Sequence, residues 1–185
     1  KPTDDERLFL NLYFDSELRP EINLSTAFPL TADKRLSTVI MAHGSMDTKS
    51  YDENHDGFRD LPESDQINIA NKWLWQAENG AQVRWGWKYV RENRLGGQMD
   101  YRKSLYRKSL YDQMLEEQSI YGSRIANRGA NAYFKVGMPV GASVYDEEAE
   151  DELRSNVAFV ADYNYFKEDA YFGLNDYDAH DNAWW

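Results

Sequence analysis

Apolar side chains alternate with polar ones along several segments of this chain. In residues 7–14, RLFLNLYF, the apolar residues Leu8, Leu10, Leu12 and Phe14 recur at every second position. This period places all four side chains on one face of an extended strand. Alternation and β-branched residues together predict about seven strands, at residues 7–14, 21–30, 35–43, 67–76, 81–90, 130–138 and 155–166.

The connections between the predicted strands alternate in length. Short ones lie around residues 31–34 and 78–80, and long polar ones lie at 46–64, 92–122 and 167–182. Outer-membrane barrels have short turns at one end and long loops at the other. The predicted fold class is therefore all-β, an antiparallel meander of about seven strands, and the connection lengths favour a segment of a transmembrane β-barrel.

Three segments fit this pattern less well. The connection predicted at 139–152 is long for its end of the barrel, and the one at 15–20 is short for an outer loop. Segment 64–80 also carries apolar residues near helical spacing, with a serine at its start and a glycine at its end. Its alternation at every second residue, which continues in the next segment, favours a strand.

The number of residues in the turn at 78–80, Glu-Asn-Gly, determines which side chains of the two flanking strands share a face. A two-residue Asn-Gly turn would divide the tryptophans of the two flanking strands between both faces of the sheet. A three-residue loop with Gly80 in a left-handed conformation places Trp73 opposite Trp85 instead. Because a one-residue slip moves every side chain to the other face, the sequence predicts the three-residue loop.

Composition excludes several classes of protein. The 185 residues have a formal net charge of −11, which argues against nucleic acid as a partner. The chain has no cysteine, so disulfides and thiolate metal sites are excluded. No run approaches the roughly 20 apolar residues of a membrane helix. We find no motif of a known catalytic site and expect no enzyme.

The segment 52–63, DENHDGFRDLPE, matches the calcium loop D-x-[DN]-x-[DN]-G-x5-E. Oxygen ligands at alternate positions let a tight turn surround a Ca²⁺ ion, and the glycine supplies a backbone conformation that other residues resist. The predicted ligands of a structural Ca²⁺ ion are the side chains of Asp52, Asn54, Asp56, Asp60 and Glu63 and the carbonyl of Phe58.

The flanks of this loop do not suit an EF-hand sensor. The preceding residues are β-branched and interrupted by glycine, and Pro62 removes a helix-supporting N–H after the loop. We therefore expect the loop to join two strands, and without an incoming helix Glu63 is the least certain ligand. An acidic turn held by Asx hydrogen bonds, without metal, is the alternative interpretation.

Tryptophans at 73, 75, 85 and 87 alternate with the basic residues Lys72, Arg84 and Lys88. Such rows are typical of the interfacial girdle of a membrane barrel. They also fit a soluble, calcium-stabilised β-sandwich that binds glycans by stacking, or the inner face of an ordinary sandwich. Alternation alone does not separate the three, because each needs one apolar face.

The segment 101–110 repeats the pentapeptide YRKSL. A five-residue period matches neither a helix nor a strand. We expect a solvated loop face, and contact with an anionic ligand or with lipopolysaccharide phosphates is the alternative.

Several longer stretches resemble a known family. DENHDGFRDLP followed by INIANKW is similar to the loop-and-strand signature of TonB-dependent outer-membrane receptors of the Bacteroidetes type. YVRENRLGGQ (89–98) and EDAYFGLNDYDAHDN (168–182) resemble later elements of the same proteins. The resemblance extends from about residue 7 to the end of the chain, is specific at 52–98 and 168–182, and is weak at 100–123.

The resemblance implies a barrel of about 22 strands around a plug domain. Such a receptor lies in the cell outer membrane, in contact with its lipid, and imports a scarce nutrient such as a siderophore, cobalamin, haem or an oligosaccharide, with energy delivered through TonB. Residues 1–185 would be a single partial β-barrel domain within it. The plug domain and TonB would be partners outside this chain, which contains no plug and no TonB box.

Overall fold

The computed structural model describes residues 8–17, 19–101, 120–146, 151–173 and 175–185. Apart from Tyr101, the YRKSL repeat and its predicted solvated face lie outside these residues. Within the described ranges, no helix is long and apolar enough to cross a membrane.

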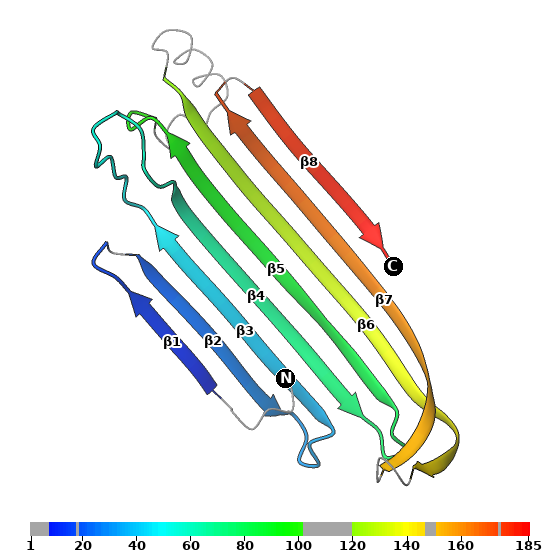
Figure 1. The fold of residues 1–185 in the computed structure, drawn as a ribbon. Coiled ribbons are helices and arrows are strands. Elements are labelled where there is room, and N and C mark those ends of the chain that lie inside the picture. Colours follow the sequence, from blue (N-terminus) through cyan, green and yellow to red (C-terminus); the bar gives the residue numbers. More distant parts are fainter. Residues whose placement is uncertain (1–7, 18, 102–119, 147–150, 174) are drawn as a thin grey trace.

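The described residues form one eight-stranded antiparallel sheet whose strands follow each other in chain order (Figure 1). This confirms the predicted all-β meander and adds one strand. The strands are β1 (Leu8–Phe14), β2 (Pro20–Pro29), β3 (Leu36–Asp47), β4 (Glu63–Gln76), β5 (Gln82–Gly97), β6 (Gly122–Asp146), β7 (Asp151–Phe172) and β8 (Asn175–Trp184). The segment 64–80, with its competing helical spacing, forms a strand as predicted.

The prediction of a polar loop over 167–182 is wrong. Strand β7 continues to Phe172, and β8 pairs with it from Asn175 onward. The Phe172 and Tyr177 rings meet edge to face, with centroids 5.9 Å apart, close to the turn of this hairpin. Backbone pairing with a neighbouring strand does not require apolar side chains, so a polar, aspartate-rich segment extends the ladder.

Other strands are also longer than the alternation predicts. Strand β5 runs to Gly97, seven residues beyond the predicted end at 90, and β6 pairs with it along its whole length. The connection predicted at 139–152 is mostly strand, since β6 ends at Asp146 and β7 begins at Asp151. The β6–β7 register shifts between Val140 and Val144, where Gly141 has a φ of 80°. Such a bulge bends a strand, and Figure 1 shows both strands curling at this end.

The β4–β5 hairpin has the predicted register. The Ala77 N–H donates to the Ala81 carbonyl (2.8 Å), and Gly80 closes the three-residue loop with a φ of 85°. Trp73 pairs with Trp85, and their rings stack with centroids 5.7 Å apart at an interplanar angle of 7°. Both tryptophans therefore lie on the same face of the sheet.

Apolar and polar side chains alternate along the strands, and the pairing register aligns this alternation from each strand to the next. The sheet therefore has two different faces. The first, which we call the apolar face, includes Leu10, Leu24, Ile40, Ile69, Trp73, Trp85, Trp87, Phe134, Phe159, Tyr163 and Trp184. The opposite face, which we call the polar face, includes Asn23, His43, Asn68, Lys72, Lys88, Glu92, Arg94, Asn131, Asp162 and Asn164.

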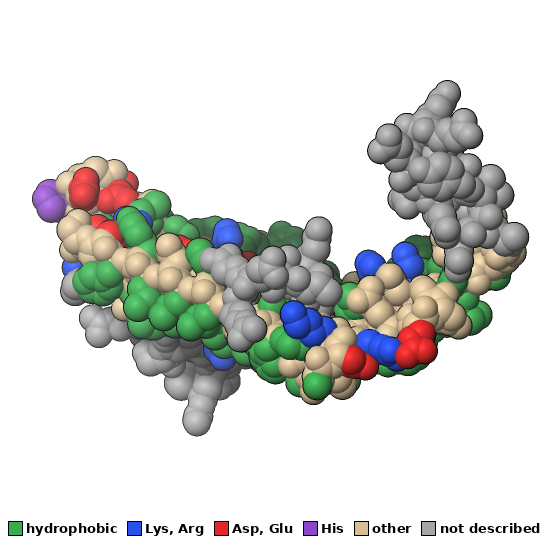
Figure 2. Space-filling model, turned by 90° about the horizontal axis from the view of Figure 1, so that it is seen from below, with side chains coloured by type: hydrophobic (Ala, Val, Ile, Leu, Met, Phe, Trp, Pro, Cys, Tyr) green, Lys and Arg blue, Asp and Glu red, His purple; other side chains and the backbone are tan. Residues whose placement is uncertain are grey.

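Large side chains of the apolar face are exposed. Leu12 is 68% exposed and Phe159 is 64% exposed. Hydrophobic side chains form much of the surface seen in Figure 2, which also shows that the sheet is curved. Among the described residues, all strands belong to this single sheet, so no second sheet packs against the apolar face.

Asn71 is a polar residue on the apolar face near the tryptophans. Its side chain is buried, and its amide donates to the Thr38 hydroxyl (2.8 Å) and to the Val39 carbonyl (2.9 Å). The Thr38 hydroxyl in turn donates to the Lys72 carbonyl (3.1 Å). Asn71 is therefore satisfied within the sheet, as buried polar groups generally are.

Gly86 allows a close approach between β4, β5 and β6. A Cβ atom at this position would lie 2.7 Å from the Asn71 carbonyl oxygen and 2.9 Å from the Tyr133 ring. Tyr133 is its direct partner on β6. A glycine that another backbone and a ring approach so closely has no room for a side chain.

We expect Gly86→Ala to lower the free energy of unfolding by about 1–3 kcal/mol, because the added methyl group forces the backbone or the Tyr133 ring to move. The control is Gly137→Ala on β6, where a Cβ atom would meet nothing within 4 Å. That change should stay within about 0.5 kcal/mol. Urea unfolding followed by tryptophan fluorescence measures both, and equal effects would contradict the packing argument.

Candidate functional site

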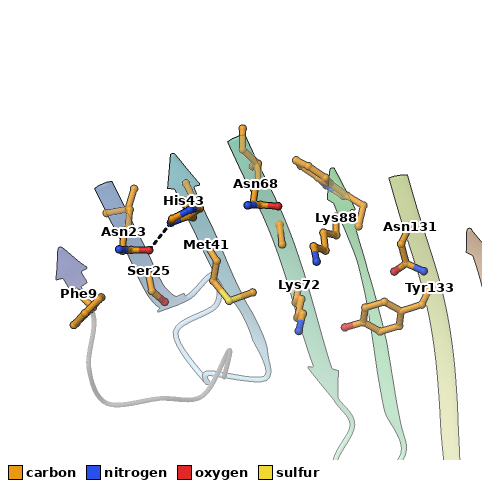
Figure 3. Close-up of a pocket in the computed structure, with 15 residues that line it drawn as sticks. Phe9, Asn23, Ser25, Met41, His43, Asn68, Lys72, Lys88, Asn131 and Tyr133 are labelled. Atoms are coloured by element: carbon orange, nitrogen blue, oxygen red, sulfur yellow. Dashed lines mark hydrogen bonds between the residues drawn. The ribbon is translucent and has the colours of Figure 1, made fainter. Parts of the chain in front are cut away.

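The polar face is hollowed between β1 and β6. A depression of about 640 Å³ lies there, and its polar lining comes from five successive strands, β2 to β6. Figure 3 shows these side chains on one side of the sheet. They are Asn23, Ser25, His43, Asn68, Lys72, Lys88, Asn131 and Tyr133. Amide, hydroxyl, imidazole and ammonium groups together suit a ligand rich in oxygen atoms.

His43 is a hydrogen-bonded residue of this wall. Its Nδ1 lies 2.8 Å from the Asn23 side-chain oxygen, the contact drawn in Figure 3. The Glu21 carboxylate is 3.8 Å from the same nitrogen. Cross-strand partners on β2 therefore orient the ring.

Lys72 and Lys88 supply the positive charge of the depression. They extend from β4 and β5 on the polar face, as the hairpin register predicts. Both side chains are exposed, and neither forms an ion pair with a carboxylate in the part of the chain that the structure describes. The amides of Asn68 and Asn131 also line the depression. The arrangement can hold an anionic or hydroxylated group by hydrogen bonds.

Asx-type hydrogen bonds organise the acidic loop between β3 and β4. Asp52 accepts bonds from the Asp56 N–H (3.0 Å) and the Gly57 N–H (2.9 Å). The Asp56 N–H also donates to the Asn54 side chain (3.1 Å), and Asp56 accepts from the Phe58 N–H (2.8 Å). Gly57 has a φ of 84°, which a glycine adopts without strain.

The fit of this loop to a Ca²⁺ ion is partial. In the described part of the chain, no three acidic or histidine side chains are grouped as a ready metal site. The bonds above are those of the acidic turn given as the alternative interpretation. A carboxylate oxygen that accepts one hydrogen bond retains a second lone pair, so Asp52, Asn54, Asp56, Asp60 and the Phe58 carbonyl remain the predicted ligands.

Glu63, the last predicted ligand, has other partners. Its carboxylate accepts from the Ser50 hydroxyl (2.5 Å) and lies 3.2 Å from the Arg59 guanidinium. The Arg59 side chain is only 3% exposed, and its guanidinium also donates to the Gln98 and Tyr101 carbonyls, at 2.5 and 2.7 Å. Arg59 therefore attaches the loop to the end of β5.

Sequence analysis assigned no role to Arg59. A single arginine inside an acidic loop is usually explained by charge compensation alone. The carbonyl partners of Arg59 lie about 40 residues further along the chain, so no local pattern indicates them. Backbone contacts reinforce the attachment: the Arg59 N–H donates to the Gly97 carbonyl (2.9 Å), and the Met99 N–H donates to the Gly57 carbonyl (2.8 Å).

Tyr51 links this loop to the β1–β2 connection. Its hydroxyl donates to the Glu17 carbonyl (3.2 Å). Burial, followed by the hydrogen bond with Glu17, raises the pKa of Tyr51 to about 12. The hydroxyl therefore remains protonated and able to donate at neutral pH. Three connections at one end of the sheet are thus joined through Tyr51 and Arg59.

The β1–β2 connection has its own ion pair. Asp15 accepts from the Arg19 side chain (2.7 Å) and from the backbone N–H groups of Glu17 and Arg19. Desolvation raises the pKa of Asp15, but the hydrogen bonds and charge of Arg19 together outweigh it and leave this pKa below its ordinary value. The carboxylate is therefore ionised at neutral pH and holds the short connection closed.

Comparisons with protein-family models, with curated proteins and with solved structures find no match to this chain. The resemblance to TonB-dependent receptors therefore rests on the residues quoted for it. In the structure, residues 52–98 form the acidic loop, β4 and β5, and residues 168–182 form most of the β7–β8 hairpin.

The acidic loop should bind Ca²⁺ at millimolar concentration, as weak extracellular sites do. Asp56→Ala should abolish the heat of binding in calorimetric titration, because it removes one ligand and the bond that shapes the turn. Glu63→Gln is the matched comparison and should leave the affinity nearly unchanged, since Arg59 and Ser50 already occupy that carboxylate. No heat from the parent, or equal heat from the parent and Asp56→Ala, would show that the motif is only a turn.

Proposed function

We propose that this chain is part of the barrel wall of a TonB-dependent outer-membrane receptor that imports a scarce nutrient. The observation that carries the proposal is the two-faced sheet. Eight strands of one antiparallel sheet present one apolar face and one polar, hollowed face. The wall of a membrane barrel needs this division, because lipid covers one face and the lumen lies on the other.

Strand length supports a membrane wall. A tilted strand crosses the hydrocarbon core with about 9–11 residues. Strands β4 and β5 have 14 and 16 residues. Strands β6 and β7 have 25 and 22 residues. The aromatic side chains of the apolar face, among them Trp73, Trp85 and Tyr163, match the girdles of such barrels.

The soluble, glycan-binding β-sandwich is the weaker alternative. A sandwich buries its apolar side chains between two packed sheets. The described strands belong to one sheet, and Leu12, Phe159 and Trp184 remain more than half exposed. Covering those side chains with lipid removes them from water without a second layer of protein.

Single-cysteine spin labelling tests the membrane wall, because the chain has no cysteine of its own. In vesicles that contain the protein carrying this segment, a label at Trp87→Cys should contact lipid-dissolved oxygen. A label at the adjacent Lys88→Cys should contact a water-soluble nickel complex. Trp87 and Lys88 lie on opposite faces of β5, because successive side chains of a strand point to opposite faces. The two labels should therefore differ in accessibility.

A second pair separates the face of a residue from its hydrophobicity. Phe159 and Val160 on β7 are both apolar, but Val160 lies on the polar face, opposite Lys135. The label at Val160→Cys should therefore be water-accessible, and the label at Phe159→Cys should be lipid-accessible. Equal accessibility within either pair would contradict a lipid-facing wall.

The depression on the polar face supports a role in import. Its amides, Lys72 and Lys88 line a surface that in the full receptor would face the lumen and the plug domain. The ligand classes with suitable oxygen atoms include siderophores, cobalamin, haem and oligosaccharides. A lumen wall of this kind would contact the ligand or the plug domain. TonB would supply the energy for transport.

Import should depend both on the protein that carries this segment and on TonB. We expect cells that lack either one to stop growing when one of these four nutrient classes is limiting, and to grow normally when the nutrient is abundant and crosses the membrane by diffusion. The measurement is growth yield across the four classes. Growth that requires the protein but is unaffected by loss of TonB would exclude this mode of import.

A further inference from the structure

Basic side chains stand directly opposite one another across the last four strands. Arg91 on β5 pairs with Arg128 on β6, Arg128 pairs with Lys167 on β7, and Lys167 pairs with His180 on β8. All four lie on the apolar face. We call Arg91, Arg128, Lys167 and His180 the basic row.

On β5 to β8, the basic row lies where the apolar face ends. The next residues on that face toward the short turns are Tyr89, Ala130, Tyr165 and Asn182. In the other direction, toward the end of the sheet that carries the acidic loop, they are Asn93, Ala126, Asp169 and Asp178. The Tyr165 ring meets His180 edge to face, with centroids 5.6 Å apart. The row therefore separates an apolar, aromatic zone from a polar one.

Like charges in this arrangement repel each other. Residues directly opposite in an antiparallel pair have Cβ atoms about 4.5–5.5 Å apart, and equal charges there are destabilising. Carboxylates reduce the electrostatic repulsion at the two flanking cations. Asp65 lies 3.7 Å from Arg91, and Asp169 lies 2.6 Å from Lys167. Arg128, between them, is exposed and forms no ion pair with a carboxylate of the described residues.

We propose that the basic row, centred on Arg128, binds the phosphate of a phosphorylated glycolipid in the outer leaflet of the membrane. This inference rests on the proposed barrel wall, which places the long-loop end outside the cell. An anion at Arg128 would also meet Arg91 and Lys167 and remove the repulsion between the three. The planar guanidinium groups match phosphate oxygens, and the tyrosines beside them suit the interfacial level of the bilayer.

The test uses vesicles of zwitterionic lipid that contain the protein carrying this segment and a titrated fraction of diphosphoryl lipid A. Binding to the parent should saturate, and lipid A without its phosphates should bind at least about fivefold more weakly, because about 1 kcal/mol is gained per cation at a charged membrane surface. Arg128→Gln should weaken binding of the phosphorylated lipid by the same factor. Lys167→Gln is a second variant with the same expectation.

Arg94→Gln is the matched control. Arg94 lies on the same strand as Arg91 but on the polar face, where it pairs with Glu92, and its loss should leave lipid binding unchanged. Equal binding by the parent and Arg128→Gln, or equal binding with and without lipid phosphates, would overturn the inference. Arg128-dependent binding of inorganic phosphate alone, in neutral micelles and as tight as that of lipid A, would overturn it as well.

The two proposals fail in different ways. If the spin labels at Trp87→Cys and Lys88→Cys show no alternation, both the barrel wall and the lipid site are excluded. If the labels alternate and lipid A binding does not depend on its phosphates, only the lipid site is excluded.

Discussion

The antiparallel hydrogen-bond ladder is the constraint on which the whole molecule depends. Because the side-chain period of a strand is two residues, one register error would exchange the two faces of every strand beyond it. The seven pairings keep Leu10, Trp73, Phe134 and Trp184 on one face and the polar lining on the other. Among the pairings of the described residues, the one irregularity lies near Gly141, close to the end of the β6–β7 hairpin, where it bends the strands and leaves the rest of the ladder in phase.

Charged and polar groups join the connections at one end of the sheet, beyond the apolar zone. Arg59 uses a buried guanidinium to attach the acidic loop to the end of β5, and Tyr51 attaches the same loop to the β1–β2 connection. On β5 to β8, the basic row marks the end of the apolar face. In the proposed barrel wall, a ladder that continues past the lipid boundary would support the loops above it, and β5 and β7 have more residues than a membrane crossing requires.

The parts of the fold that could be predicted are those marked by a pattern among residues close together in the sequence. Alternation identified the seven apolar strands, and the parity of the tryptophans decided the turn at Gly80. Strand β8 was missed because Asp176, Asp178 and His180 alternate with residues of no consistent hydrophobicity, so its only signal is pairing with β7. The ligand motif of the acidic loop was visible, but Glu63 had a different partner that depends on the end of β5.

The amino-acid sequence by itself determined which side chains can share a face, because a period of two residues is a property of the extended backbone and needs no neighbour. It likewise placed the partners of Asp52 in the acidic loop within its reach, because these hydrogen bonds join residues four and five positions apart. Only the tertiary structure decided that Arg91, Arg128 and Lys167 stand in one row and that Arg59 reaches Tyr101. These contacts join residues about 40 positions apart, and they exist only once hydrogen bonds between strands have set the register.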